Sequence, residues 1–220
     1  MTLIKVCGVT LLDDAAAVAD AGVDFVGLNF WDRSKRYVER DRAAMIATAA
    51  RAARPEVAIV GLFVNAHADE IAEIHAAVGL DIVQLHGDEP ASACREVADL
   101  IGRPVWKAIS VGTAADVGRL GDWPVDAVLL DAPSAGRGGS GQTFDWAHAT
   151  AAVARHRDRR CVLAGGLTPA NVGAAIAAVR PWAIDVASGV ERAPGVKDRD
   201  KVRALVAAVR AADGAIGDKP

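Results

Sequence analysis

Eight short runs of apolar, often β-branched residues alternate along the chain with longer alanine-rich stretches, and this alternation restricts the possible folds more than any other feature. The runs are almost continuously hydrophobic, as expected for parallel strands that are covered on both faces. We place them at residues 3–7, 25–30, 58–64, 82–86, 105–110, 127–131, 161–164 and 183–187. The intervening stretches have the composition of crossover helices, for example residues 13–21, 41–54, 69–78, 90–101 and 169–179.

Eight such units in 220 residues favour a closed (β/α)8 barrel, at the short end of the usual length of that fold. An open, doubly wound sheet of eight strands is the competing architecture. No Pro-, Gly- or Ser-rich linker divides the chain. We therefore predict one α/β domain, a TIM barrel over residues 1–210, followed by a frayed C-terminal tail over residues 211–220.

Composition and charge exclude several classes of function. With 25 Lys and Arg against 28 Asp and Glu, the net charge of −3 offers no field that attracts nucleic acid. No run approaches the roughly 18 apolar residues of a membrane span, and the first residues lack the pattern of an export signal. The three cysteines form no CxxC pair, so we expect a cytoplasmic protein. Without an evident apolar surface stripe, we also expect a monomer.

Cys7 is the first candidate for chemistry, because the active site of a βα barrel is built where the strands end. It shares the parity of Lys5, which predicts that the thiol and the ammonium lie on the same side of the strand. A neighbouring cation lowers the pKa of a thiol and supplies the thiolate that acts as base or nucleophile. The alternative is a small buried apolar residue, which is the interpretation we favour for Cys94 and Cys161.

Asp131 ends an apolar run, where a carboxylate has little structural use unless it is paired or solvated at the barrel mouth. There a protonated carboxyl group can donate a proton to a substrate, although a loop-capping aspartate is the alternative. His86 is the only one of the five histidines that we place at the end of a strand. Arg36, in the loop after the second run, could clamp a substrate carboxylate through two parallel hydrogen bonds, or be an ordinary surface arginine.

Glycine-rich segments follow the last three strands. Gly165 and Gly166, together with Ser188 and Gly189, form the better candidate for binding phosphate through backbone N–H groups, with two tight turns as the alternative. Residues 136–141 match GxGxxG, but they do not directly follow their strand and no acidic residue ends the next one, so we reject a dinucleotide site there. No HExxH motif or carboxylate cluster suggests a metal.

Taken together, these segments resemble phosphoribosylanthranilate isomerase, a barrel enzyme of tryptophan biosynthesis. The order and spacing of the matching segments, more than any single one, are specific to that family. The matching segments are Lys5–Gly8, Gly61–Asn65, Val83–Gly87, Leu130–Asp131, Gly138–Gly141, Phe144–Trp146, Leu163–Leu167, Asn171, Ser188–Glu191 and Gly195–Asp198.

The resemblance implies an intramolecular oxidoreductase that converts N-(5-phosphoribosyl)anthranilate to the 1-deoxyribulose 5-phosphate by an Amadori rearrangement. Asp131 matches the general acid of the family and Cys7 its general base. Arg36 and His86 would hold the anthranilate end, and Asp185 would support the site. Backbone groups around Gly165, Gly166, Ser188 and Gly189 would bind the phosphate. The small-molecule substrate would be the only partner, and no cofactor or metal would be needed.

Three departures from the family pattern concern Lys35, Ser140 and Ala187, where Pro, Thr and Ser are usual. They affect details of the phosphate loops and leave the acid and base in place. The nearest rival is the sister isomerase of histidine biosynthesis, but that family has a carboxylate where this chain has Cys7. A barrel that only binds a sugar phosphate would not need Cys7 and Asp131 together, and a metal-dependent epimerase would need several His and Asp ligands.

Overall fold

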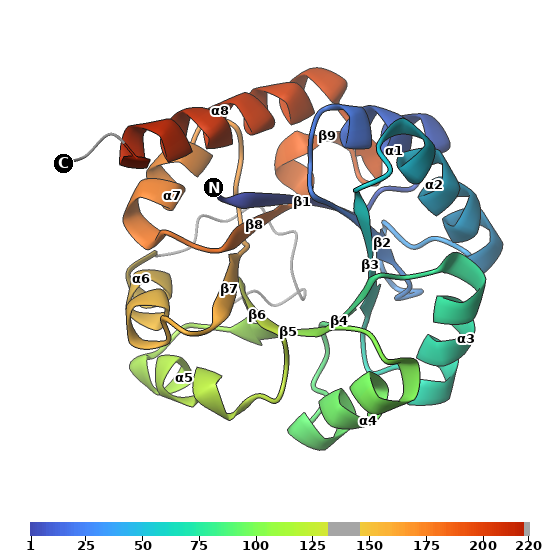
Figure 1. The fold of residues 1–220 in the computed structure, drawn as a ribbon, viewed down its shortest axis with the longest axis horizontal. Coiled ribbons are helices and arrows are strands. Elements are labelled where there is room, and N and C mark those ends of the chain that lie inside the picture. The colour runs from blue at the N-terminus through green and yellow to red at the C-terminus, as the bar shows by residue number, and fades with distance from the viewer. Residues whose placement is uncertain (132–145, 218–220) are drawn as a thin grey trace.

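The computed structural model describes residues 1–131 and 146–217, and within them eight parallel strands close into a barrel. Their order around the barrel is the order in the sequence, which excludes the open, doubly wound sheet. Figure 1 looks down the barrel, with the strands inside a ring of helices. The strands are β1 (Leu3–Cys7), β2 (Phe25–Asn29), β3 (Ala58–Phe63), β4 (Ile82–Leu85), β5 (Val105–Ser110), β6 (Ala127–Asp131), β7 (Arg160–Leu163) and β8 (Ala183–Val186).

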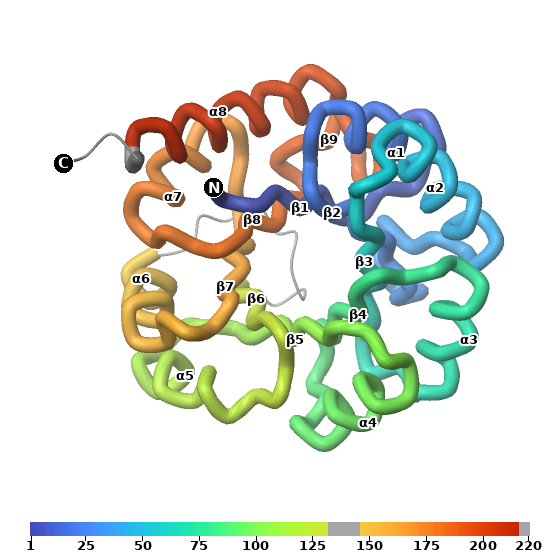
Figure 2. Tube along the Cα trace, in the orientation of Figure 1, coloured from blue at the N-terminus to red at the C-terminus, as the bar shows by residue number. Residues whose placement is uncertain are grey.

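A helix follows each strand and lies on the outside of the barrel, as the tube in Figure 2 also shows. The α-helices of the described residues are α1 (Leu12–Asp20), α2 (Arg40–Ala53), α3 (Ala68–Val78), α4 (Ala91–Ile101), α5 (Ala114–Arg119), α6 (Trp146–Arg155), α7 (Val172–Val179) and α8 (Arg199–Gly217). Between β8 and α8 the chain forms a 3-10 turn, η2 (Ser188–Val190), and a hairpin of β9 (Glu191–Ala193) and β10 (Val196–Lys197).

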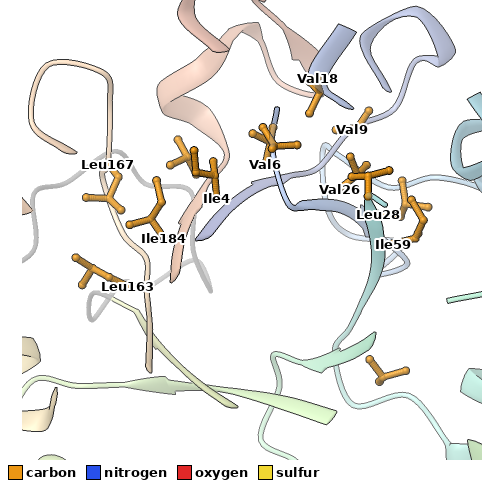
Figure 3. Close-up of a cluster of buried hydrophobic side chains, with 14 of the residues drawn as sticks. Ile4, Val6, Val9, Val18, Val26, Leu28, Ile59, Leu163, Leu167 and Ile184 are labelled. Atoms are coloured by element: carbon orange, nitrogen blue, oxygen red, sulfur yellow. The ribbon is translucent and has the colours of Figure 1, made fainter. Parts of the chain in front are cut away.

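The larger hydrophobic core lies between the strands and the helices. Alternate residues of each strand point outward, so Ile4 and Val6 of β1 lie against Val18 of α1 in the same buried cluster. Figure 3 shows these side chains, with Val26 and Leu28 of β2, on the outer side of the barrel wall. Alanine and valine dominate the helix faces, which allows the short helices to pack closely on the sheet.

The C-terminal tail differs from our expectation, because α8 continues to Gly217 and residues 211–217 are helical. The reason is a long-range contact that the local sequence does not reveal. Asp213 accepts hydrogen bonds from the backbone N and the hydroxyl of Thr2, at 2.8 and 2.7 Å. Arg210, one turn earlier, donates to the carbonyl of Thr2 at 2.8 Å, so the last helix is bound to the residue that precedes β1.

Candidate active site

A cavity of about 370 Å³ opens among the carboxyl ends of the strands and the loops that follow them. Most of the predicted site residues line it, although they come from strands and loops that are far apart in sequence. The predicted residues that line the cavity are Cys7, Arg36, His86, Asp131, Gly165, Gly166, Asp185 and Ser188. Gly189 instead supports the wall, because a Cβ atom at this position would lie 1.9 Å from the carbonyl oxygen of Leu167.

Cys7 lies at the mouth end of β1, with a side chain that is almost entirely buried but reaches the cavity. Lys5, two residues earlier, points to the same side, and its Nζ lies 2.9 Å from Oδ2 of Asp185 on the neighbouring strand β8. Burial lowers the pKa of Lys5, but the nearby Asp185 carboxylate and Cys7 together outweigh this effect and the pKa is raised. The predicted placement of a cation beside the thiol is therefore correct.

The expected consequence for the Cys7 thiol is wrong in sign. Burial raises the pKa of Cys7 above its ordinary value, and the opposing effect of Lys5 is too small to reverse this. Asp185 raises the pKa of Cys7 further, because a second negative charge nearby disfavours the thiolate. The surroundings thus favour the thiol form of Cys7, and the charge of Lys5 reduces the size of this effect.

Asp185 combines a paired oxygen with an unpaired one. Oδ2 accepts the hydrogen bond from Lys5, whereas Oδ1 is buried and has no hydrogen-bond partner among the described residues. The residue also lines the cavity. A buried acceptor without a partner is costly, so this oxygen is suited to receive a hydrogen bond from a bound polar group.

His86 and Asp131 lie side by side at the mouth, with Nε2 of His86 3.3 Å from Oδ2 of Asp131. On its other side the ring contacts the buried Gln84, whose Nε2 lies 2.9 Å from Nδ1 of His86. An amide nitrogen can only donate, so in this arrangement Nδ1 accepts and a neutral ring carries its hydrogen on Nε2, toward Asp131. The structure thus brings His86 to the predicted acid, a contact that the sequence did not indicate.

Arg36 also has an unexpected partner. Its Nε and Nη2 donate to the two carboxylate oxygens of Glu191, at 2.8 and 2.7 Å, across 155 positions of sequence. Ser34 fixes the backbone of this loop, because its hydroxyl accepts from the backbone N of Arg36 and from the side-chain amide of Asn29, both at 3.1 Å. Arg36 therefore lines the cavity with a side chain that Glu191 fixes in place, and the alternative of an ordinary surface arginine is wrong.

The two predicted phosphate loops meet on one side of the cavity. Gly165 and Gly166 have positive φ angles of 88° and 63°, a conformation that suits glycine and turns the backbone sharply after β7. The side chain of Asn171 closes this turn, since it accepts from the backbone N of Thr168 at 2.8 Å and donates to the carbonyl of Gly166 at 3.0 Å. After β8 the 3-10 turn η2 begins at Ser188.

Four buried polar residues around the site received no role from the sequence. Gln84 interrupts an apolar run. Its place on the inward side of the strand was the sequence signal that could have identified it. Glu191 and Lys197 lie within the segments that resemble the family. Only the fold shows that they form an ion pair, with Nζ of Lys197 2.7 Å from Oε1 of Glu191. Lys107 of β5 donates to the carbonyl of Gly87 at 2.7 Å and pairs with Glu89 at 3.0 Å, which holds the loop after β4.

Several further expectations concern groups outside this site. The predicted glycine-rich loop over residues 136–141, with Ser140, lies outside the described residues. Within the described residues, no group of three or more His, Cys, Asp or Glu side chains is arranged to hold a metal ion. Cys94 and Cys161 are buried in the outer core, as we interpreted them. Among the helices of residues 1–131 and 146–217, none is long and apolar enough to span a membrane.

Comparison with known proteins covers nearly the whole barrel. A model of the N-(5′-phosphoribosyl)anthranilate (PRA) isomerase family matches residues 4–208. The N-(5′-phosphoribosyl)anthranilate isomerase of Citrifermentans bemidjiense is 47% identical over 208 residues, which cover 94% of this chain and 96% of that protein.

Two solved structures agree with the fold and extend the comparison to a ligand. One contains monomers of the dimeric phosphoribosylanthranilate isomerase of Thermotoga maritima, with 38% identity, a TM-score of 0.82 and coverage of 96% of this chain and 100% of that one. The other is a phosphoribosylanthranilate isomerase in complex with reduced 1-(o-carboxyphenylamino)-1-deoxyribulose 5-phosphate, with 36% identity, a TM-score of 0.81 and the same coverage.

Proposed function

Because the chain belongs to the phosphoribosylanthranilate isomerase family, its reaction is the Amadori rearrangement of N-(5′-phosphoribosyl)anthranilate, and we propose that Asp131 is the acid and Cys7 the base. One observation supports both roles most directly. The two side chains line one cavity from strands that β7 and β8 separate in the barrel wall, so they face a bound sugar from different sides. An acid and a base held in this way can act on two atoms of one substrate.

The first step opens the ribose ring. Asp131 donates a proton to the ring oxygen O4′ as the C1′–O4′ bond breaks, and the anthranilate nitrogen supplies the electron pair that forms the C1′–N double bond of a Schiff base. Asp131 becomes a carboxylate at this moment. The neighbouring His86 Nε2–H, 3.3 Å away, is placed to donate to that carboxylate and stabilise it.

The second step moves a proton from carbon. Cys7, as the thiolate, removes the C2′ proton, and the electrons shift through C2′ and C1′ to the nitrogen to give an enolamine. Protonation at C1′ and loss of the hydroxyl proton then give the 2′-ketone. C2′ is oxidised and C1′ is reduced within the same molecule, so the atoms and electrons balance without an external oxidant or reductant.

Lys5 and Asp185 have different roles beside Cys7. The Lys5 ammonium, which is fully buried, favours the thiolate by its charge. The Asp185 carboxylate anchors Lys5 at 2.9 Å through Oδ2, and its second oxygen is suited to accept a hydrogen bond from a ribose hydroxyl. We assign Asp185 to substrate binding on this basis.

The two ends of the substrate are both anionic, and the cavity has a group for each. The phosphate would contact backbone N–H groups of Gly165, Gly166 and Ser188, in loops that the buried Gly189 holds together. The anthranilate carboxylate would contact Arg36 on the opposite loop. This binding mode would place C1′ and C2′ between Cys7 and Asp131.

Oligomeric state and location are further proposals. We infer a monomer, and the dimeric relative from Thermotoga maritima makes light scattering at working concentration the direct check. A cytoplasmic location rests on the cysteine content, since all three thiols are unpaired.

Turnover of freshly prepared N-(5′-phosphoribosyl)anthranilate, followed by the loss of anthranilate-type fluorescence without added metal, tests the proposal. We expect rapid turnover by the wild type and a loss of about 10²- to 10⁴-fold in Cys7→Ala and in Asp131→Asn, with substrate binding retained. Cys94→Ala is the matched control, because it removes a buried thiol that does not line the cavity.

The outcomes separate the competing assignments. An active Cys7→Ala protein would exclude the thiol as base, and an active Asp131→Asn protein would exclude that carboxyl as acid. If the folded wild type did not convert this substrate but converted the aminoimidazole carboxamide nucleotide of histidine biosynthesis, the rival substrate assignment would replace ours.

A further inference from the structure

A buried cluster of three charged side chains lies behind the cavity wall: Arg36, Glu191 and Lys197. Glu191 accepts two hydrogen bonds from Arg36 at 2.8 and 2.7 Å, and its Oε1 also accepts from Nζ of Lys197 at 2.7 Å. The backbone N of Gly195 donates to the same oxygen at 3.1 Å. Glu191 is thus the centre of the cluster.

Glu191 and Lys197 are not in contact with the cavity, although Arg36 lines it. The side chains of Glu191 and Lys197 are 5% and 1% exposed, against 16% for Arg36. Burial raises the pKa of Glu191, but the hydrogen bonds from Arg36 and the charge of Lys197 outweigh it, so the pKa lies below its ordinary value. Glu191 is therefore an anion that two cations hold in place.

Glu191 leaves one edge of the Arg36 guanidinium for another anion. The group has five N–H donors arranged as two forks, one of Nε and Nη2 and one of Nη1 and Nη2. Glu191 takes the first fork with both of its oxygens. The second fork then has a fixed direction, since the plane of the guanidinium is set by a two-point contact.

Lys197 extends the cluster to the strand that bears the base. Its Nζ donates to the backbone carbonyl of Cys7 at 2.6 Å and lies 3.4 Å from the carbonyl of Ala187. Its own backbone N donates to the carboxylate of Asp14 at 2.7 Å, which anchors it to α1. Through Lys197, the end of β1 and the end of β8 share one buried ammonium.

We propose that Glu191 and Lys197 are positioning residues of the active site, with Glu191 aiming Arg36 at the substrate carboxylate and Lys197 fixing the end of β1 where Cys7 sits. Neither touches the substrate. The inference rests on the proposed function, because it assumes that Arg36 binds the carboxylate and that Cys7 is the base. We therefore expect Glu191 to affect substrate binding and Lys197 to affect proton removal, although the two form one ion pair.

Glu191→Gln keeps the shape of the side chain and removes the charge that orients Arg36. We expect KM for N-(5′-phosphoribosyl)anthranilate to rise about tenfold or more, the effect of weakening one charge-assisted contact, while kcat changes much less. In Lys197→Met we expect the reverse, a lower kcat with little change in KM. With substrate deuterated at C2′, the isotope effect on kcat should increase in Lys197→Met, because proton removal by Cys7 becomes slower.

Asp81→Asn is the matched control for loss of a carboxylate that pairs with an arginine. Asp81 accepts from Nη2 of Arg51 and from the backbone N of Ile59, both at 2.8 Å, before β4 and away from the cavity. This variant should lower the melting temperature and leave KM, kcat and the isotope effect unchanged. If Glu191→Gln does not fold, Glu191→Asp retains the charge, retracts the carboxylate and should still raise KM.

Arg36→Ala shows which of the two proposals fails. A raised KM in Arg36→Ala together with an unchanged KM in the Glu191 variants would overturn the positioning role alone. An unchanged KM in Arg36→Ala would overturn the binding role of Arg36, and the positioning role with it. Parallel losses of kcat and melting temperature, without the split between KM and kcat, would show that the cluster is only structural.

Discussion

The two ends of the barrel interior are built from different chemistry. At the floor, where the strands begin, the rings of Phe25, Trp106 and Trp182 contact one another, with centroids 5.1 to 5.9 Å apart. At the mouth, where the strands end, Cys7 and Asp131 take the corresponding inward positions. Both ends line the same barrel, so the difference arises from the side chains where the strands begin and end.

At the floor the side chains are packed against one another, whereas toward the mouth some buried polar atoms have no hydrogen-bond partner among the described residues. The floor rings fill the interior with apolar and edge-to-face contacts. Toward the mouth, Oδ1 of Asp185 and Oε1 of Gln84 are buried without hydrogen-bond partners among the described residues, and Cys7 has a raised pKa. Close apolar packing is therefore concentrated at one end of the barrel interior, and unsatisfied polar groups are concentrated at the other.

Removing the largest floor side chain should give the largest loss of stability. Trp106→Ala deletes an indole that is 2% exposed, and we expect the free energy of unfolding to fall by about 3–5 kcal/mol. Urea denaturation measures this loss, and KM of the protein that remains folded should not change. Cys7→Ala at the mouth should cost far less. Equal losses in the two variants would contradict the division between floor and mouth.

The next largest loss of stability should come from breaking the ion pair of Lys5 and Asp185, which lies between the floor and the mouth. Lys5→Met leaves the Asp185 carboxylate buried without its partner, and we expect a loss of about 3 kcal/mol in unfolding free energy, with slower turnover. The double variant Lys5→Met/Asp185→Leu removes both charges and should regain much of this stability without regaining activity. Recovery of turnover in the double variant would show that the pair has no part in catalysis.

The cysteine at the beginning of β7 should make stability depend on alkaline pH. Burial raises the pKa of Cys161 from 9.0 to about 11. Below pH 9 both states keep the proton; between pH 9 and 11 the unfolded chain loses it and the folded protein does not, so stability falls as pH rises. Between pH 9 and 11, we expect the unfolding free energy of the wild type to fall by up to about 2 kcal/mol more than that of Cys161→Ala. The unfolding free energies are measured by urea denaturation at a series of pH values. The same dependence on pH in both proteins would refute this prediction.

The smallest effect should come from the loops after β7 and β8, which we propose to bind the phosphate. In Gly189→Ala the new Cβ would collide with the carbonyl oxygen of Leu167, so the loops after β7 and β8 must separate. We expect KM to rise about tenfold and inhibition by inorganic phosphate to weaken in proportion. Gly118→Ala is the control and should behave as wild type, because in α5 the new Cβ would meet no atom within 4 Å beyond its chain neighbours and its own helix backbone.

Much of the site follows from strand parity and from the rule that barrel loops form the site. Parity along residues 3–7 predicted that Lys5 and Cys7 share a side, and both point inward. The strand ends identified Cys7, His86 and Asp131 as neighbours of one mouth. These predictions succeed because a period of two and a closed barrel leave little freedom for side chains at the ends of strands.

The errors have a common cause, which is that they depend on contacts across the barrel. The lowered pKa expected for Cys7 ignored its burial, which only the assembled barrel produces. The pairing of Arg36 with Glu191 spans 155 positions, and the contact of Thr2 with Asp213 spans 211. No local pattern measures such distances.

Periodicity and composition are enough to specify the eight strands, the ring of helices and the set of polar residues at the mouth, because they dictate local structure and the facing of side chains. Which of these residues touch, which charges are paired and how burial changes the pKa of Cys7 follow only from the closed barrel. Desolvation and pairing depend on all the elements that surround a group, and those elements come together only when the barrel closes.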